Sequence, residues 1–377
     1  MGFSYPKYLA AKRTVDERAR HPGVWSTFVD QLRERHSRTT RLRDLSRGKA
    51  RSEEEGANGG SSSPVEGRER AKRLRLLEIG GGVGDLAIKV LETLRDLPLE
   101  YTLVDIERDN LALAEKRVRS IAPDVDVIPR YRQPDGPGSA PQRNRQTAAC
   151  ETDPCVYLVQ EDVLDISLDL LCSVTGKDAV RPFDAVCGQA ILDIVPPRML
   201  LRKMHSIVAD LGLVYLPIHF DGQTKIEPVL DLNLDRRVEN IYHDSMKRRG
   251  KRPSGEIVSY DGSRSGRDLL MHGGRTGFHV EAAGASEWVV LPSSMRSQTG
   301  SGSTGSGQDA SAYPEDEQYF LSCMLGFIED ELRASEEMSD RAYKRWSTTR
   351  RRQLEEGRLA MFVHNLDVLL RKPKTSR

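Results

Sequence analysis

The sequence has almost no net charge and no long apolar run. Its 57 lysines and arginines balance 56 aspartates and glutamates, for a formal charge of +1, which excludes strong bulk attraction to nucleic acid or to an anionic membrane. No window approaches the roughly 20 continuous apolar residues of a membrane-spanning helix, and the segment Met1 to Pro6 has no apolar signal core. We therefore expect a soluble chain without nucleic-acid or membrane partners.

Cysteine is also scarce. The five cysteines are scattered, and the pair Cys150 and Cys155 has no second pair and no histidine cluster at zinc-ligand spacing. This pattern favours free thiols in a reducing compartment over a disulfide framework. We expect a cytoplasmic protein without a metal site.

Apolar residues make up only 38% of the 377 residues, below the usual globular fraction, so part of the chain should lie outside a core. Three stretches rich in glycine, serine, proline or glutamine cannot bury enough apolar area to offset the entropy of ordering them. The predicted organisation is a helical cap at 1–45, a disordered insertion at 46–70, a core at 71–292 with a flexible insertion at 131–155, a disordered linker at 293–316, and a helix with a closing strand of the same domain at 317–377.

Between these stretches, short apolar runs alternate with segments of helical periodicity. Such alternation predicts a doubly wound α/β fold, a parallel sheet with helices on both faces. The runs at 278–283 and 359–370 are expected to close the far edge of the sheet. The other predicted strands are 74–79, 100–104, 156–159, 183–187 and 211–218, and the predicted helices are 85–97, 110–121 and 197–208.

Glycines follow the first predicted strand, where the chain turns into a helix. Gly80, Gly82 and Gly84 lack Cβ atoms, so the backbone can turn sharply and a ligand can approach the main chain. In an open α/β sheet, ligands bind at the carboxyl ends of the strands. A glycine-rich turn alone is weak evidence, because a tight turn explains it almost as well.

Two acidic residues strengthen this prediction. Asp105 ends the second strand, where a carboxylate suits the two hydroxyls of a ribose, and Asp162 follows the third strand, where it would meet an adenine edge. Each carboxylate alone is more typical of a solvated strand end. Together with the glycines they predict a nucleoside cofactor site.

The charges around the glycines indicate which nucleoside. The spacing Gly80-x-Gly82-x-Gly84 departs from the Gly-x-Gly-x-x-Gly fingerprint of dinucleotide sites. Asp85 would repel a pyrophosphate at the start of a helix, and Glu78 suits a cation. A ligand with a sulfonium and an ammonium but no phosphate fits this pattern.

These residues resemble the motifs of class I S-adenosylmethionine-dependent methyltransferases. The segment 78–84 is similar to the first motif, Asp105 to the ribose ligand, Asp162 to the adenine-side residue and 183–195 to the fourth motif. The resemblance implies a mostly parallel, seven-stranded sheet with an antiparallel last strand, S-adenosylmethionine as cofactor, and Val163 and Gln189 as further contacts. The segments 8–20, 219–222 and 362–370 are similar to a small-molecule branch, which implies a small-molecule methyl acceptor.

Methyl transfer needs alignment above all, so a base is optional. The candidates are His219 and His243, with Asp193 and Asp221 as carboxylate alternatives. His243 also fits a surface position on a polar helix, and His219 a position that caps the fifth strand. Near the start of the chain, Arg20 (or Arg18) could pair with the carboxylate of the cofactor, although an amphipathic helix that covers the sheet would explain the same pattern.

Three other functions remain open at this point. A catalytically silent scaffold with the same fold would bind cofactor without turnover. A nicotinamide-dependent oxidoreductase is disfavoured by the missing sixth-position glycine. Methylation of amides or exocyclic amines in macromolecules is disfavoured because 189–192 reads Gln-Ala-Ile-Leu rather than an Asn-Pro-Pro-Tyr type of tetrapeptide. The sequence does not identify the acceptor or the oligomeric state.

Overall fold

The structure is a computed structural model that describes residues 3–55, 73–131, 154–175, 180–192, 194–251, 257–296 and 312–375. Asp193 and most of the predicted insertions, at 56–70, 132–153 and 297–311, lie outside these residues. The four described cysteines are free thiols. In the described part of the chain, no helix is long and apolar enough to cross a membrane, and no group of three potential metal ligands occurs.

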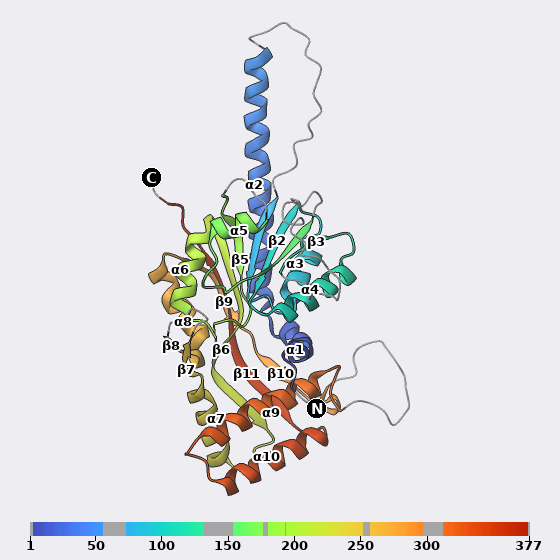
Figure 1. Cartoon of the computed structure of the whole chain (residues 1–377), viewed down its shortest axis with the longest axis vertical. Helices are drawn as coiled ribbons and strands as arrows, with labels where there is room; N and C mark the ends of the chain where they lie inside the picture. Colours follow the sequence, from blue (N-terminus) through green and yellow to red (C-terminus); the bar gives the residue numbers. More distant parts are fainter. Residues whose placement is uncertain are drawn as a thin grey trace, which may run out of the picture.

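A nine-stranded sheet forms the centre of the molecule (Figure 1). Its order is β10-β11-β6-β5-β1-β2-β4-β3, and β9 also pairs with β11. The strands from β3 to β6 are mutually parallel, whereas β11 runs antiparallel to β6. The strands are β1 (Leu74–Ile79), β2 (Leu99–Asp105), β3 (Asp126–Arg130), β4 (Cys155–Gln160), β5 (Phe183–Cys187), β6 (Val208–Glu227), β9 (His279–Ala285), β10 (Trp288–Val290) and β11 (Ala360–Arg371).

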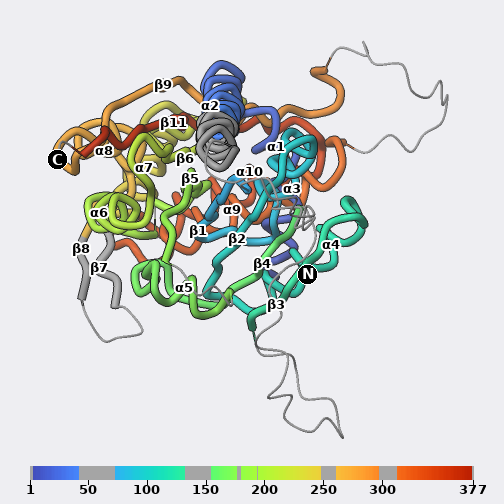
Figure 2. The backbone as a smooth tube through the Cα atoms, turned by 90° about the horizontal axis from the view of Figure 1, so that it is seen from above, coloured from blue at the N-terminus to red at the C-terminus, as the bar shows by residue number. Residues whose placement is uncertain are grey.

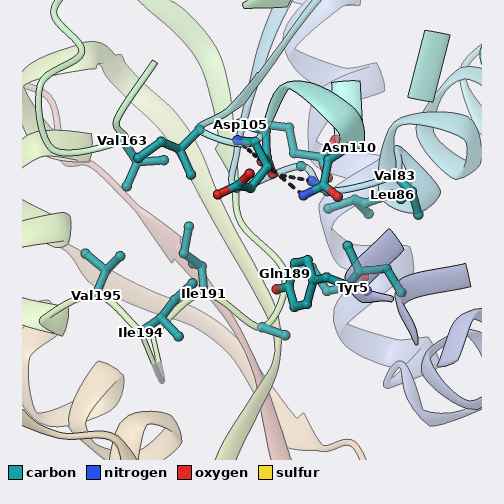
Figure 3. Close-up of a pocket in the computed structure, with 18 of the residues that line it drawn as sticks. Tyr5, Val83, Leu86, Asp105, Asn110, Val163, Gln189, Ile191, Ile194 and Val195 are labelled. Carbon is teal, nitrogen blue, oxygen red and sulfur yellow. Dashed lines mark hydrogen bonds between the residues drawn. The ribbon is translucent and has the colours of Figure 1, made fainter. Parts of the chain in front are cut away.

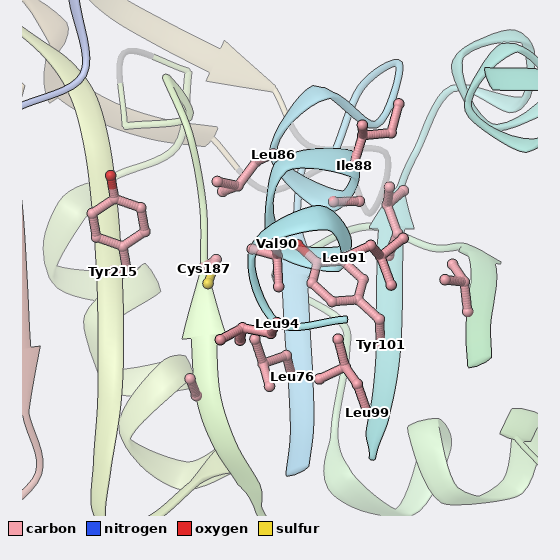
Figure 4. Close-up of a cluster of buried hydrophobic side chains, with 14 of the residues drawn as sticks. Leu76, Leu86, Ile88, Val90, Leu91, Leu94, Leu99, Tyr101, Cys187 and Tyr215 are labelled. Carbon is pink, nitrogen blue, oxygen red and sulfur yellow. The ribbon is translucent and has the colours of Figure 1, made fainter. Parts of the chain in front are cut away.

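Helices cover both faces of the sheet (Figure 2). One face packs against α2 (Pro22–Glu55), α3 (Asp85–Thr93) and α4 (Arg108–Ile121), and the other against α5 (Leu168–Thr175), α6 (Pro197–Ile207) and α8 (Ser265–Gly273). Alternate residues of each strand point to opposite faces. Thus Leu76 and Tyr101 pack under α3 (Figure 4), while Leu77 and Val104 belong to the core of the other face.

A third apolar cluster lies beyond the parallel strands, around the extended ends of β6 and β11. The helices α1 (Tyr5–Ala19), α7 (Leu232–Ser245), α9 (Glu317–Ala334) and α10 (Asp340–Glu355) contribute to it. In Figure 1, α7, α9 and α10 form the lower part of the molecule, and α1 lies between them and the sheet. A separate hairpin, β7 (Lys247–Lys251) with β8 (Ile257–Asp261), follows α7.

The predicted fold class is confirmed: the sheet is mostly parallel, with helices on both faces and an antiparallel strand next to β6. The sheet has nine strands rather than seven because two strands were not predicted: β3 extends one edge, and β10 pairs with β11 in addition to the predicted β9. Helix α2 continues to Glu55, past the predicted boundary at residue 45. The predicted insertion 46–70 is rich in glycine and serine only in its later part, whereas 46–55 contains alanine, lysine, arginine and glutamate, which are good helix formers.

Candidate functional site

A cavity of about 390 Å³ opens at the carboxyl ends of the parallel strands. Its floor comes from the ends of β1, β2, β4 and β5, and its roof from α1 together with Tyr260 of β8 and Trp288 of β10. Figure 3 shows Asp105 and Val163 on one side of this space and Ile191, Gln189 and Tyr5 on the other. The cavity lies at the edge where open α/β sheets bind ligands.

The glycine-rich turn forms the centre of the floor, and its backbone needs glycine. Gly80 and Gly82 have φ values of +61° and +53° and line the cavity, a conformation that costs other residues energy. A Cβ on Gly80 would lie only 2.3 Å from Cδ1 of Ile191. Gly84, the residue before α3, has φ +81° and packs against Ala114 rather than lining the cavity. The turn therefore exposes main chain to the cavity.

Asp105 lies at the end of β2, held by donors on three sides. Its Oδ2 accepts from the backbone N–H of Gly82 at 2.7 Å, and its Oδ1 accepts from the N–H of Glu107 at 2.8 Å and from Nδ2 of Asn110 at 3.1 Å. Burial raises the pKa of Asp105 above its ordinary value, and these hydrogen bonds act in the opposite direction. The carboxylate is thereby fixed in the cavity wall.

Asn110, in the first turn of α4, was missed by the sequence analysis. It lines the cavity, and its Oδ1 is buried without a hydrogen-bond partner among the described residues. A buried amide oxygen without a donor is costly. Asp105 and Asn110 therefore offer neighbouring acceptors in the same wall, one of them unsatisfied (Figure 3).

Asp162 and Val163, which follow β4, also line the cavity. The Oδ1 atom of Asp162 accepts from the N–H of Leu164 at 2.8 Å, which fixes the turn after the strand. The three predicted features therefore lie at the ends of neighbouring strands: Asp162 after β4, Asp105 at the end of β2, and the glycines after β1.

Glu78 is the deepest acid of the floor, with 2% of its surface exposed. Its Oε2 accepts from the phenol O–H of Tyr101 at 2.8 Å. The pKa of Glu78 is raised to about 8, chiefly by burial; the hydrogen bond from Tyr101 acts to lower this pKa, and the neighbouring carboxylates Asp85 and Asp105 act to raise it. The free carboxyl therefore holds a proton at neutral pH, and a cation next to it would favour the ionised form.

A buried polar network joins the roof to the floor. Asp16 of α1 is 1% exposed, lies 3.2 Å from Nζ of Lys12, and accepts from Nε1 of Trp288 and from Nε2 of Gln189, both at 2.9 Å. Nη2 of Arg20 donates to Oε1 of Gln189 at 2.7 Å. Lys12, Gln189 and Trp288 line the cavity, but Asp16 and Arg20 stand behind them.

The network and its surroundings place a different cation at the cavity from the predicted Arg20 or Arg18. Arg20 is bound to Gln189, and Nη1 of Arg18 forms an ion pair with Glu317 of α9 at 2.7 Å. Lys12 is the only cationic side chain among the described residues that line the cavity. The sequence analysis missed it because lysine in an amphipathic helix is usually solvated, and only the packing of α1 against β10 reveals its position.

The predicted bases are not brought to the cavity wall. His219 is 1% exposed, its Nε2 lies 3.2 Å from the carbonyl oxygen of Gly188, and burial lowers its pKa to about 3. His243 of α7 lies next to Phe220, and burial lowers its pKa as well. Neither histidine is among the described residues that line the cavity, and Asp193 is outside the described residues.

No protein-family model matches this sequence, and no curated protein matches it. Several solved structures are similar to it. Phosphoethanolamine N-methyltransferase 2 of Haemonchus contortus, in complex with S-adenosyl-L-methionine, is 13% identical with a TM-score of 0.34 over 80% of this chain and 49% of its own. Cyclopropane synthase MmaA2 of Mycobacterium tuberculosis is 11% identical, with a TM-score of 0.34 over 80% and 79%. The CMeT domain of the citrinin polyketide synthase is 16% identical, with a TM-score of 0.33 over 56% and 42%.

This chain therefore spans about half of the length of the nematode enzyme. The parallel order β4-β2-β1-β5-β6, followed by the antiparallel β11, is the sheet that the resemblance implies. The chain has a doubly wound, Rossmann-like α/β fold. Within this fold, the cavity lies on the edge where the glycine-rich turn and the two predicted carboxylates meet.

The charged side chains that line the cavity favour some classes of ligand over others. Five acidic side chains line it (Glu78, Asp85, Asp105, Glu107 and Asp162), against one lysine among the described residues. Nη2 of Arg117 is hydrogen-bonded to Asp85 on the outer side of the turn. Acidic walls repel phosphates and attract cations, so the lining of the cavity is electrostatically unsuited to a ligand that carries phosphate groups.

Proposed function

We propose that the cavity binds S-adenosylmethionine and that the protein transfers its methyl group to a small molecule. The observation that carries this proposal is the pair formed by Asp105 and Asn110. Two neighbouring acceptors, one a carboxylate and the other a buried amide oxygen without a donor, line the same wall. Adjacent ribose hydroxyls are donors that would satisfy both.

The remaining residues suit the other parts of this cofactor. Asp162 and Val163, two strands away from the glycine-rich turn, would meet the adenine. The main chain of Gly80 and Gly82 would run along the methionine portion. Glu78 would pair with its ammonium, and Lys12 with its carboxylate, the role first predicted for Arg20.

S-adenosylmethionine supplies an electrophilic methyl carbon: the acceptor's lone pair forms the new bond, and the electron pair of the broken carbon–sulfur bond stays on the departing sulfur. The protein's own contribution is alignment, which can account for much of the rate of such a displacement. The roof of α1 residues Tyr5, Tyr8 and Leu9 would hold the reactants in line and exclude water.

Calorimetry with S-adenosylhomocysteine tests this function directly, because the product binds without turnover. We expect saturable binding and a thermal shift, and no binding of NAD⁺ at the same concentration. Binding of NAD⁺ alone would support the oxidoreductase alternative. Binding of S-adenosylhomocysteine without methylation of any compound in a fractionated cell extract would support a catalytically silent scaffold.

A further inference from the structure

The strand β6 contains a β-bulge beside the segment that follows β5. In the register with β11, two residues of β6, Pro217 and Ile218, lie opposite the single residue Asp367. Ile218 has a φ of +59°, a left-handed conformation that is costly for a β-branched side chain. Strained residues persist only where their surroundings hold them, and both they and bulges are enriched next to functional sites. The group that holds this bulge therefore bears on the cavity.

That group is Asp367, whose side chain is fully buried. A bulge leaves its extra residue unpaired in the ladder, and Oδ1 of Asp367 accepts from the backbone N–H of Ile218 at 2.8 Å. Oδ2 accepts from the N–H of His21 at 2.9 Å, in the short connection between α1 and α2. Because a buried N–H without an acceptor is costly, one carboxylate stabilises both the bulge and the end of the roof helix.

One further hydrogen bond connects the bulge to the floor of the cavity. The carbonyl oxygen of Pro217 accepts from the N–H of Ala190 at 3.2 Å. Ala190 also has a left-handed conformation, with φ +48°, and it lines the cavity between Gln189 and Ile191, which Figure 3 labels. Ile191 packs against Gly80 of the glycine-rich turn. A shift of Pro217 would therefore move residues that face the ligand.

The second hydrogen bond of Asp367 leads to the same segment by another route. His21 directly follows Arg20, whose Nη2 donates to Oε1 of Gln189. Burial raises the pKa of Asp367, whereas its hydrogen bonds and the charge of Arg20 act to lower it, so the guanidinium lies near this carboxylate. Both routes from Asp367 end at or beside Gln189, which also donates to Asp16 of α1.

Resting on the proposed function, we propose that Asp367 is a positioning residue for the methionine portion of S-adenosylmethionine. Asp367 is not among the described residues that line the cavity. It holds residues 189–191 and the end of α1 next to Gly80 in the floor and Lys12 in the roof, which were both assigned above to that portion. The proposed adenine and ribose contacts lie at the ends of β4 and β2, on the far side of β1 from β6. Loss of Asp367 should therefore weaken the contacts to the methionine portion alone.

Two ligands separate this role from a general loss of stability. S-adenosylhomocysteine contains the amino-acid portion, whereas 5′-methylthioadenosine keeps the adenine, ribose and sulfur without it. In Asp367→Asn, the amide retains one acceptor oxygen, and its Nδ2 group would face one of the two N–H donors. We expect the dissociation constant for S-adenosylhomocysteine to rise about tenfold and that for 5′-methylthioadenosine to stay within about twofold, measured by calorimetry. Equal weakening of both ligands, or of neither, would overturn the proposal.

Asp184→Asn is the matched control. Asp184 is also a buried carboxylate that accepts a backbone N–H, that of Arg75 at 3.0 Å, but it lies near the amino end of β5, away from the cavity. We expect both dissociation constants to remain those of the wild type. If the wild type does not bind S-adenosylhomocysteine, the proposed function fails. If it binds and Asp184→Asn loses affinity as Asp367→Asn does, only the present inference fails.

Hydrogen exchange tests the connection without a ligand. The N–H of Ala190 does not contact Asp367 and is linked to it through Pro217. We expect its protection from exchange to fall by about tenfold in Asp367→Asn. In Asp184→Asn, the amide of Arg75 should lose protection and that of Ala190 should not. Unchanged protection of Ala190 in Asp367→Asn would contradict the proposal.

The wild type supplies a measurement that does not depend on a variant that folds. If Asp367 joins the bulge, the α1 end and the cavity segment, the amides of Ile218, His21 and Ala190 should open together. Native-state hydrogen exchange in low concentrations of denaturant should then give these three amides one shared opening free energy. Different opening free energies would show that the three segments move independently and would overturn the proposed role of Asp367.

Discussion

The floor and the roof of the cavity are held in place by different forces. The floor lies at the ends of parallel strands whose residues are almost all buried, so its position follows from the packing of the sheet. The roof, α1, instead depends on Asp16 and its partners on one side and on aromatic contacts with α9 on the other, where Tyr8 stacks on Phe320 with ring centroids 5.8 Å apart. Substitutions of polar residues should therefore destabilise the roof more than they destabilise the floor.

The largest effect is expected from Asp16→Ala in the roof. This change removes the shared acceptor of buried Lys12, of the buried indole N–H of Trp288 and of the half-buried amide of Gln189. Removal of one partner from a buried ionic network should lower the free energy of unfolding by about 3 kcal/mol, measured by urea denaturation.

Glu17→Ala is the control, because Glu17 is exposed and its ion pair with Arg13 is at the surface. This variant should change the free energy of unfolding by less than about 0.5 kcal/mol. Equal urea midpoints for Asp16→Ala and wild type would show that the roof does not depend on this network.

Asp105→Asn should act on the floor mainly through a large loss of binding, with a smaller loss of stability. The amide has one acceptor oxygen where the carboxylate has two, so its Nδ2 group would face one of the N–H donors that now bind Asp105. It also lacks the charge that strengthens hydrogen bonds from ligand hydroxyls. We expect the dissociation constant for S-adenosylhomocysteine to rise about 100-fold, measured by calorimetry. Asp109→Asn is the matched control, because Asp109 is exposed in the first turn of α4, four residues after Asp105. A similar loss in both variants would indicate a general electrostatic effect instead of a specific contact.

A pH-dependent effect, smaller for each pH unit, is expected at Glu78. Because its pKa in the folded protein is about 8, the free carboxyl is protonated at pH 6 to 7, and a ligand ammonium must displace that proton. Affinity for S-adenosylhomocysteine should therefore rise by up to about tenfold per pH unit below pH 8 and level off above it. The same shift implies that the folded state holds a proton that the unfolded state releases near its ordinary pKa of 4.5, so this group's contribution to stability is lost as pH rises from about 4.5 to 8.

Glu78→Gln should remove both dependences, since glutamine can still accept the hydrogen bond from Tyr101. Calorimetry at pH 6, 7 and 8, and urea denaturation at the same pH values, measure the two slopes. Unchanged slopes in Glu78→Gln would assign the titration to another group.

These contrasts also explain which parts of the site could be predicted. Gly80, Asp105 and Asp162 were found from the sequence because each lies within a few residues of a strand end, and strand order places those ends together. Lys12, Trp288 and Tyr260 could not be found this way. Lys12 is more than 240 residues from the other two, and the three meet only because α1 packs against β10 and β8 follows α7 into the same region. Local patterns encode strands and turns, whereas the roof depends on tertiary packing.

The histidine in the middle of β6 lies in neither the floor nor the roof of the cavity, and we expect the smallest effect there. His219 is shielded from water and its pKa is lowered to about 3, chiefly by burial and also by the charge of Lys12. Its ring resonances, assigned by comparison with His219→Gln, should not shift between pH 5 and 9 in an NMR titration, and the variant should bind S-adenosylhomocysteine within about twofold of wild type. A midpoint between pH 5 and 8 would mean that water reaches the imidazole. His219 would then be available as a base next to β5. The middle of β6 would then count as part of the cavity, in addition to the floor held by the sheet and the roof held by the polar network.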